Sequence, residues 1–370
     1  MINKRIMTVV GARPQFIKAA AVSRHLQDQG LKEVLVHTGQ HYDANMSDIF
    51  FRELGLKAPG YHLGIGSGGH GAQTGEMLKA IESVLLQERP DLVMVYGDTN
   101  STLAGALAAA KLHIPVAHVE AGLRSYNRNM PEELNRVLTD HLSDLLFAPS
   151  SLACDNLKRE GIQGASVLMS GDVMYDIALR MGALADQESR ILENLKLSSR
   201  GYVLATVHRA ENTDHPERLL AILYGLEAVA RKLPVLFPMH PRTRKLLVAA
   251  GMAAPREPGM RWTDPVGYLD MIQLEKHARL IATDSGGVQK EAYFQQVPCV
   301  TLRDETEWTE LVDLGWNRLV PPRDSESLAT ALQEALDAPP GLEQFPYGTG
   351  AAGIEIAKTL RRYLEPAEAP

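Results

Sequence analysis

The chain has little cysteine and no long hydrophobic run, and each shortage excludes a class of protein. Only two of the 370 residues are cysteines, Cys154 and Cys299, and both stand in apolar or helical surroundings. A disulfide-stabilised fold or a cysteine zinc site is therefore not expected, and two buried thiols fit a reducing cytoplasm. The apolar run after Lys4 and Arg5 is too short for a signal-peptide core or a membrane span.

The chain also lacks an excess of positive charge. Its formal net charge is -7 and its pI is about 6.0, which argues against nucleic acid as the main partner. A local cluster of arginine and lysine side chains can still bind a small anionic ligand. Hydrophobic residues make up 45% of the chain and charged residues 22%, as in a soluble globular protein with two domain cores.

Low-complexity tracts and short repeats are absent too, and strand-like segments instead alternate with helix-like segments. Strand-like apolar runs occupy 6–10, 34–37, 92–96, 116–119 and 145–148, and then 202–206, 235–237, 280–282, 300–302 and 318–320. Helix-like stretches occupy 15–26, 72–86, 102–112, 132–142 and 151–160, and then 216–231, 242–250, 268–276, 288–295 and 325–337.

This alternation predicts an α/β protein with two doubly wound, Rossmann-like parallel sheets. The predicted domains are 1–175 and 176–350, and the last stretch, 351–370, is predicted to be a helix that returns to the first domain. We expect the two sheets to face a cleft at the carboxyl ends of their strands, where open parallel sheets bind ligands.

A glycine-rich turn, Asp284–Gly287, follows one buried strand and opens into a helix-like stretch. Strand, glycine-rich turn and helix together aim backbone N–H groups and a helix dipole at a phosphate. Glu291 follows about one helical turn later, where a carboxylate can reach ribose hydroxyls. The segment therefore indicates a nucleotide site, although an ordinary turn with a helix cap would give the same pattern.

Two cations follow the first strand of the first domain. Arg13 and Lys18 stand at the start of the first helix-like stretch, where positive charge opposes the helix dipole. A diphosphate or carboxylate ligand would explain them, and a solvated surface pair is the alternative.

Carboxylates follow the next strands of the same domain. Asp98 and Glu120 each come after a buried strand, and Glu132 opens the helix that begins after Pro131. Asp98 can instead be a helix cap, and one of Glu132 and Glu133 can be an ordinary first-turn acid. If all three converge, their mutual repulsion raises some of their pKa values and supplies both an acid and a base.

Histidines follow two strands of the second domain. His208, with Arg209 beside it, comes after one strand, and His240 comes after the next. His208 can supply a proton or charge to a leaving phosphate, or it can be a satisfied polar group at a strand end. No spacing of Cys, His and carboxylates is typical of a zinc site, and no Gly-x-Ser-x-Gly turn supports acyl transfer.

Taken together, these motifs resemble those of the non-hydrolysing UDP-N-acetylglucosamine 2-epimerases, in order over nearly the whole chain. The resemblance implies a two-domain, glycosyltransferase-B-like fold, a cytoplasmic homodimer, and no metal or redox cofactor. The motifs that carry it are Gly11–Lys18, Gly97–Thr99, His118–Arg124, Pro131–Glu133, His208–Arg209 and Asp284–Gly287.

The resemblance also implies a mechanism and the residues that serve it. UDP leaves C1 of the sugar while C2 loses its proton, and UDP then adds back to the glycal while C2 is protonated on its opposite face. By this resemblance, Asp98, Glu120 and Glu132 transfer protons and stabilise the oxocarbenium charge, and Lys18 lies near the sugar. His208 assists the departing UDP, and Glu291 binds the ribose. The implied phosphate or UDP contacts come from Arg13, Arg209, His240, Ser285, Gly286 and Gly287.

Two departures from the family pattern refine this interpretation. Regulated members carry Gln-His-Arg-Glu-Met and a later arginine at a second UDP-sugar site, whereas this chain has Gln40–Asp43 and Glu76 there. Reversed charge at an anion site argues against activation by UDP-N-acetylglucosamine. The segment 303–317 looks more like the branch acting on UDP-2,3-diacetamido-2,3-dideoxy-D-glucuronate, a precursor of bacterial surface polysaccharides such as O-antigen.

Several alternatives share parts of this pattern. They are a UDP-N-acetylglucosamine 2-epimerase, a hydrolysing 2-epimerase, a UDP-sugar glycosyltransferase and a non-catalytic UDP-sugar sensor. A C6 carboxylate on the sugar would need a nearby cation, and the candidates are Arg124, Arg128, Arg209 and Arg242.

Overall fold

The structure is a computed structural model, and it describes residues 4–40 and 54–365. The chain forms two compact units. The first unit runs to Ile177 and resumes at Phe345, and the second unit spans Ala178–Gln344. The division falls within helix α7 (Val173–Glu188).

The first unit is built on a seven-stranded sheet with the order β3-β2-β1-β4-β5-β6-β7, and every strand pairing is parallel. Its central strands are apolar and buried on both faces, as parallel sheets require. The strands are β1 (Arg5–Val10), β2 (Lys32–His37), β3 (Tyr61–His62), β4 (Leu92–Tyr96), β5 (Val116–Val119), β6 (Leu145–Ala148) and β7 (Val167–Met169).

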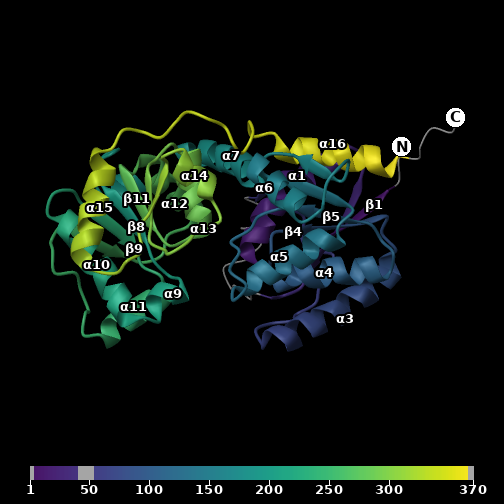
Figure 1. The fold of residues 1–370 in the computed structure, drawn as a ribbon, viewed down its shortest axis with the longest axis horizontal. Coiled ribbons are helices and arrows are strands. Elements are labelled where there is room, and N and C mark those ends of the chain that lie inside the picture. The colour runs from purple at the N-terminus through teal and green to yellow at the C-terminus, as the bar shows by residue number, and fades with distance from the viewer. Residues whose placement is uncertain (1–3, 41–53, 366–370) are drawn as a thin grey trace. The chain divides into compact units, whose positions relative to one another are not determined.

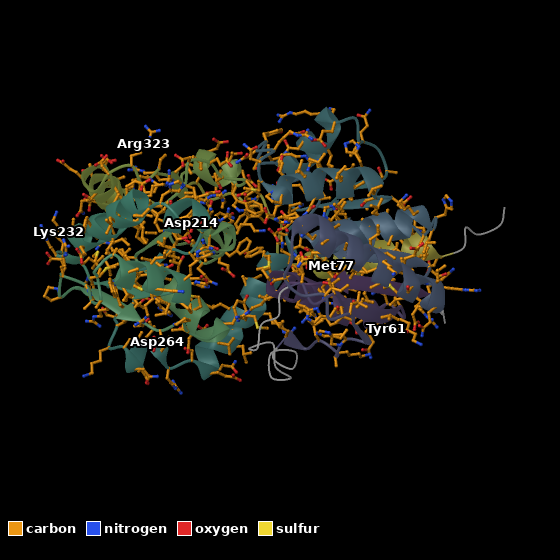
Figure 2. All side chains as sticks on the ribbon, turned by 90° about the horizontal axis from the view of Figure 1, so that it is seen from below. Tyr61, Met77, Asp214, Lys232, Asp264 and Arg323 are labelled. Carbon is orange, nitrogen blue, oxygen red and sulfur yellow. The ribbon has the colours of Figure 1, made fainter. Side chains whose placement is uncertain are left out.

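Helices cover this sheet and close its core. Met77 of α3 is fully buried there, whereas Tyr61 lies on the edge strand β3, and Figure 2 labels both. Besides α7, the helices are α1 (Arg13–Asp28), α3 (His70–Glu88), α4 (Asn100–Lys111), α5 (Pro131–Leu142), α6 (Ser151–Arg159) and α16 (Ala352–Leu364).

The last described helix, α16, returns to the first unit and lies beside α1 (Figure 1). The carboxylate of Asp176 accepts hydrogen bonds from the N–H groups of Ala352 and Gly353, at 3.1 and 2.8 Å. A methyl group on Gly353 would lie 2.1 Å from the carbonyl oxygen of Ala21, so only glycine permits this close approach. The predicted return of the C-terminal helix is confirmed, and residues 366–370 lie outside the described residues.

The second unit repeats the plan with a six-stranded parallel sheet of order β10-β9-β8-β11-β12-β13. Its strands are β8 (Val203–Thr206), β9 (Val235–Pro238), β10 (Met260–Thr263), β11 (Leu280–Thr283), β12 (Cys299–Thr301) and β13 (Asn317–Leu319). Its helices are α8 (Ile191–Asn194), α9 (Ala210–Thr213), α10 (Pro216–Ala230), α11 (Pro241–Ala249), α12 (Tyr268–His277), α13 (Gly286–Phe294), α14 (Thr309–Asp313) and α15 (Ser325–Asp337).

The predicted fold class, two doubly wound parallel α/β sheets, is confirmed. The elements that the sequence did not predict are short or lie at sheet edges. β3 has two residues, β7 has three, and β10 is a partly exposed edge strand with alternating polar residues, so none shows a long apolar run. Helix α7, which the sequence did not predict, spans the expected domain boundary at 175 and 176.

Candidate active site

The sheet order of each unit brings the candidate residues together at its carboxyl edge. In the first unit, the strand order runs outward in both directions from β1 and β4, so the topological switch point lies between these two strands. In the second unit, the same switch lies between β8 and β11. Loops diverge at such a point and leave a crevice, which is where doubly wound sheets bind ligands. The candidate side chains follow these strands.

Lys18 and Glu120 form an ion pair at the switch point of the first unit, and both side chains are mostly buried. Glu120 comes directly after β5 and has a φ of +75°, which is costly for a residue with a side chain. Gly97, at the end of β4, packs against the pair, because a methyl group there would lie 3.2 Å from Lys18 Nζ and 3.3 Å from Glu120 Oε2. A strained acid held against a lysine is expected of a functional group rather than a packing residue.

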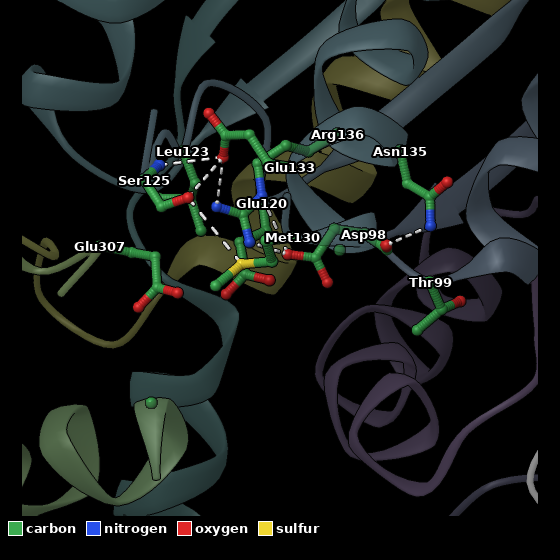
Figure 3. Close-up of polar contacts among 12 residues, drawn as sticks. Asp98, Thr99, Glu120, Leu123, Ser125, Met130, Glu133, Asn135, Arg136 and Glu307 are labelled. Carbon is green, nitrogen blue, oxygen red and sulfur yellow. Dashed lines mark hydrogen bonds and ion pairs between the residues drawn. The ribbon is translucent and has the colours of Figure 1, made fainter. Parts of the chain in front are cut away.

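Asp98 is held by an arginine of α5 (Figure 3). Its Oδ2 accepts hydrogen bonds from Nη2 and Nε of Arg136, at 2.5 and 3.1 Å. Nη1 of the same arginine donates to Oε2 of Glu133 at 3.0 Å. The Glu133 carboxylate also accepts the backbone N–H groups of Ser125 and Tyr126, both at 2.9 Å. Glu133 therefore fixes Arg136, and Arg136 fixes Asp98.

The two adjacent glutamates of α5 have different surroundings. Glu133 is 3% exposed and fully engaged, whereas Glu132 is exposed on the surface of the first unit. Arg13, at the start of α1, is half-buried. The structure therefore brings Lys18 to Glu120 and Arg136 to Asp98, so that each of these two carboxylates has its own cation.

In the second unit, the buried carboxylate of Asp284 organises the loop after β8. Its oxygens accept the backbone N–H of His208 at 3.1 Å and of Arg209 at 3.0 Å. Nδ2 of Asn212 donates to the same carboxylate at 3.1 Å. Asp284 is 0% exposed, so these bonds replace its hydration. The loop that carries His208 is thereby tied to the turn that opens α13.

The ring of His208 is partly exposed and lies near a second histidine. Its centroid is 6.0 Å from that of His240, which caps α11 by accepting the N–H of Arg242 at 3.2 Å. Burial lowers the pKa of His208, and the charges of His240 and Arg209 lower it further, against the opposing charge of Asp284. His208 can therefore change its protonation state readily below neutral pH.

The turn Asp284–Gly287 opens α13 as a capped helix. Ser285 is the N-cap, and its hydroxyl accepts the N–H of Val288 at 3.4 Å. The first N–H groups of a helix have no acceptor within the helix and carry the positive end of its dipole. Ser285 and Gly286 are partly exposed and Gly287 is exposed. The segment therefore presents the anion-binding geometry that its sequence predicts.

Charged and aromatic groups surround the start of α13. A methyl group on Gly286 would lie 3.7 Å from both Arg209 Nη2 and Trp308 Nε1, and 3.9 Å from Glu307 Oε2. Trp308 Nε1 donates to the carbonyl of Gly286 at 3.0 Å. Glu307 is bonded at 3.0 Å by Arg303, whose side chain is 0% exposed. Arg209 therefore lies beside the expected phosphate position.

Glu291 lies on α13 and is partly exposed. Its carboxylate interacts electrostatically with Glu275 of α12, which is 1% exposed. Burial raises the pKa of Glu275 well above its ordinary value, and the negative charge of Glu291 raises it further. Burial therefore favours the protonated form of Glu275, and Glu291 is the more exposed carboxyl group of the two, which a ribose hydroxyl can reach.

The sequence left several of these residues unassigned. Glu133, Arg136, Asp284, Arg303 and Glu307 hold the candidate residues rather than face a ligand. Asp284 and Glu133 lie in sequence motifs, and Arg303 and Glu307 lie in the segment 303–317, but nothing in the sequence gave any of the five this supporting role. Of the arginines considered for a C6 carboxylate, Arg124 is occupied by Asp140 and Glu160, and Arg242 is paired with Asp214.

Two other features bear on the choice of function. Among residues 4–40 and 54–365, no group of three or more His, Cys, Asp or Glu side chains is arranged to hold a metal ion. None of the helices in this part of the chain is long and apolar enough to cross a bilayer. The stretch 41–43, which bears on activation by UDP-N-acetylglucosamine, lies outside the described residues.

Comparisons with known proteins give a family match over most of the chain. The family model for UDP-N-acetylglucosamine 2-epimerase matches residues 24–361. A UDP-N-acetylglucosamine 2-epimerase homolog of Methanococcus maripaludis is 52% identical over 96% of this chain and 99% of its own length. The UDP-2,3-diacetamido-2,3-dideoxy-D-glucuronate 2-epimerase of Pseudomonas aeruginosa is 51% identical over 97% of this chain and 99% of its own length.

Solved structures extend the likeness to the fold. The crystal structure of Methanocaldococcus jannaschii UDP-GlcNAc 2-epimerase in complex with UDP-GlcNAc and UDP superposes with a TM-score of 0.87. It is 44% identical and covers 98% of this chain and 100% of the matched chain. A UDP-GlcNAc 2-epimerase from Neisseria meningitidis bound to UDP-GlcNAc gives a TM-score of 0.86 at 29% identity, over 97% of this chain and 100% of that chain.

Proposed function

Because the chain belongs to the UDP-N-acetylglucosamine 2-epimerase family, it is a UDP-sugar 2-epimerase, and we propose that its substrate is UDP-2,3-diacetamido-2,3-dideoxy-D-glucuronate. The enzyme would invert C2 between the gluco and manno configurations and supply a precursor of a bacterial surface polysaccharide. The 51% identity to the P. aeruginosa enzyme of that specificity supports this choice, although a UDP-N-acetylglucosamine 2-epimerase homolog is 52% identical, so identity alone does not decide between the two sugars. The segment 303–317, which resembles the same branch, supports it.

We propose that the reaction proceeds by elimination and re-addition of UDP. A base removes the C2 proton while the bond from C1 to the diphosphate oxygen breaks, which leaves a glycal and free UDP. The diphosphate oxygen then bonds to C1 again, and an acid returns a proton to the opposite face of C2. Removal and return of a proton at one carbon require groups on both faces of the sugar.

Asp98 and Glu120 are our candidates for the proton transfers. Each carboxylate is paired with its own cation, Arg136 and Lys18 respectively. We assign Glu132 to the positive charge that develops at C1, because its exposed carboxylate is free of the bonds that engage Glu133.

We propose that the second unit binds UDP. The N-terminus of α13, with Ser285, Gly286 and Gly287, would receive the phosphates together with Arg209. Glu291 would accept hydrogen bonds from the ribose, and His208 would donate to the departing diphosphate, with His240 close to it. Arg13 of the first unit is the remaining candidate for a phosphate contact.

Proton NMR in D2O tests this function. The protein is incubated with UDP-N-acetylglucosamine in one tube and UDP-2,3-diacetamido-2,3-dideoxy-glucuronate in another. Deuterium at C2 and a manno-configured product in the second tube alone are the expected result. Turnover in the first tube would assign the enzyme to UDP-N-acetylglucosamine, and free sugar would identify a hydrolysing enzyme. No exchange in either tube would overturn the epimerase mechanism.

UDP-N-acetylglucosamine is the second candidate substrate. The M. jannaschii enzyme of that specificity is 45% identical to this chain, so family membership alone does not separate the two sugars. We also propose a cytoplasmic homodimer with no cofactor, as the family resemblance implies. Light scattering coupled to size-exclusion chromatography should give twice the chain mass of 40.6 kDa, and a monomer at working concentrations would contradict the dimer.

A further inference from the structure

A buried histidine lies behind the candidate carboxylates of the first unit. His118 stands in β5 and its side chain is 0% exposed. Both of its ring nitrogens are 2.7 Å from an oxygen atom: Nδ1 from Oδ1 of Asp140, and Nε2 from the backbone carbonyl of Gly97. None of the roles assigned above uses this histidine.

Both oxygens that face the ring can only accept hydrogen bonds. A carbonyl has no proton to give, and neither has an ionised carboxylate. Although burial opposes ionisation of Asp140, the charges and hydrogen bonds of His118 and Arg124 lower its pKa. A neutral ring would turn one nitrogen lone pair toward an oxygen lone pair at 2.7 Å. Both nitrogens must therefore carry protons.

A cationic ring gives each oxygen of the buried Asp140 carboxylate a positively charged partner. Oδ2 of Asp140 accepts from Nη1 of Arg124 at 2.7 Å and from the N–H of Gly122 at 3.1 Å. Arg124 also makes a bidentate pair with Glu160 at 2.7 and 2.6 Å. When His118 is protonated, the contacts run from a cation (His118) to an anion (Asp140), then to a cation (Arg124) and an anion (Glu160). With a neutral ring, the fully buried carboxylate of Asp140 would have only Arg124 as a cation, which it shares with the partly exposed Glu160.

Gly97 links this cation to the candidate active site. Its carbonyl accepts from His118, and its Cα faces the ion pair of Lys18 and Glu120. It also immediately precedes Asp98 and adopts a φ of +61°. The Gly97 peptide therefore stands between the buried imidazole and the carboxylates proposed to move the C2 proton.

We propose that His118 is a doubly protonated positioning residue, which fixes the Gly97–Asp98 turn and places a positive charge behind the carboxylates that transfer the proton. The positioning role rests on the function proposed above. The charged and titratable groups around the ring are Asp140 of α5, Arg124 after β5, Glu160 of α6, Lys18 of α1, and Glu120 and Asp98 after β5 and β4.

Long-range 1H–15N NMR of the protein labelled with 15N-histidine tests the charge without any substrate. At pH 9, one of the 12 histidines should still show both ring nitrogens protonated, whereas an unperturbed imidazole is neutral there. The same signal should be missing from H118Q. A wild-type spectrum at pH 9 in which every ring is neutral would overturn the proposal, and this result needs no variant to fold.

Kinetics of H118Q test the positioning role. Glutamine donates hydrogen bonds only from its amide nitrogen and carries no charge. We expect kcat to fall at least tenfold, since small misplacements of reacting groups cost up to about 100-fold, while KM stays within about twofold. The matched control is H141Q on α5, because His141 is half-exposed and lies 3.6 Å from Glu160. Unchanged kcat in H118Q, or a loss confined to KM, would contradict the proposal.

The two proposals fail in different ways. If wild-type protein turns over neither UDP-sugar, the proposed function is wrong, but the NMR spectrum still reports whether His118 is an imidazolium. If wild-type protein is active and every histidine ring is neutral at pH 9, the inference about His118 is wrong and the epimerase function stands.

Discussion

The carboxylate of Asp284 holds His208 through its backbone and its ring. Both carboxylate oxygens lie 3.1 Å from the His208 backbone nitrogen, and Oδ1 lies 3.6 Å from Nδ1 of the ring. One fully buried acid therefore sets where the loop after β8 stands and influences the charge of its histidine. The two residues come from neighbouring strands of the second sheet, β8 and β11.

Replacing Asp284 by asparagine should weaken this arrangement. Hydrogen bonds to a charged acceptor contribute about 1.5–3 kcal/mol each, so we expect UDP affinity to fall about tenfold or more. The pKa of His208 should also fall further, because the Asp284 charge opposes the effects of burial, His240 and Arg209. Calorimetry with UDP and an NMR titration of His208 measure both effects. The control is D264N, whose carboxylate is 89% exposed and is labelled on the surface in Figure 2. Equal affinity in D284N and D264N would contradict the role of Asp284.

Gly97 should tolerate no side chain. In G97A, the left-handed backbone costs about 1–2 kcal/mol, and the new methyl group would press on Lys18 Nζ and Glu120 Oε2 at 3.2 and 3.3 Å. We expect kcat to fall by about 10-fold to 100-fold. G161A is the control for backbone strain alone, because Gly161 has a φ of +83° but no atom lies within 4 Å of the position of the added methyl group. Similar kcat values in the two variants would show that the contact with the ion pair is unimportant.

Lys18 and Glu120 should act as one unit. Each single change, K18M or E120Q, leaves a mostly buried charge without its partner. We expect each to reduce kcat by about 100-fold or more, and the double variant to lose much less than the product of the two factors. The partly exposed pair Lys4–Asp91, bonded at 2.8 Å, provides the control, because its two changes should affect kcat independently. Strictly multiplicative losses at Lys18 and Glu120 would mean that the two do not cooperate.

His37 should make the folded protein less stable in acid. Burial, together with the charge of His62, lowers the pKa of His37 to about 4, and its Nδ1 accepts the N–H of Gly39 at 3.0 Å. Between pH 6.5 and pH 4, the unfolded chain therefore binds a proton that the folded chain refuses, so stability falls as pH falls. Allowing for solvent screening, the loss is on the order of 1–2 kcal/mol.

The variant H37Q should reduce this dependence. Melting temperatures measured from pH 7.5 to pH 4.5 are expected to fall less steeply for H37Q than for wild type, whereas H215Q, a change at an exposed position, should follow wild type. Parallel curves for wild type and H37Q would assign the acid sensitivity to other groups.

Asp176 should anchor the returning helix. Its carboxylate accepts the N–H groups of Ala352 and Gly353, so D176A removes both bonds at the start of α16. We expect a loss of about 1–2 kcal/mol and faster hydrogen exchange throughout α16. D155N, which changes an exposed position on α6, is the control. Unchanged exchange in α16 would show that packing against α1 holds the helix without this cap.

The strands and the glycine-rich turn could be predicted because local sequence determines them. The runs 92–96 and 145–148 are continuously apolar, 116–119 is apolar except for one histidine, and the structure has strands with the same bounds. Ser285 and its two glycines predicted the capped start of α13 in the same way. Such signals need no knowledge of distant parts of the chain.

The residues that support the site could not be predicted, because tertiary contacts define them. Glu132 and Glu133 are chemically identical neighbours, and the phase of α5 alone turns Glu133 inward toward Arg136. Arg303 is charged and yet fully buried, which no local pattern indicates. His118 interrupts an apolar strand, and only the placement of Asp140 and Gly97 explains it.

The return of α16 to the first unit has a consequence for biosynthesis. All of Ala178–Gln344 is translated before the residues that complete the first unit, so the inserted second unit can fold on the ribosome while the unit that was begun earlier is still unfinished. Until α16 emerges, the surface of α1 that it covers, and the partners of Ile356, Ala357 and Leu360, remain open to solvent. The N-terminal half of this enzyme is therefore the part that a nascent-chain chaperone would hold longest.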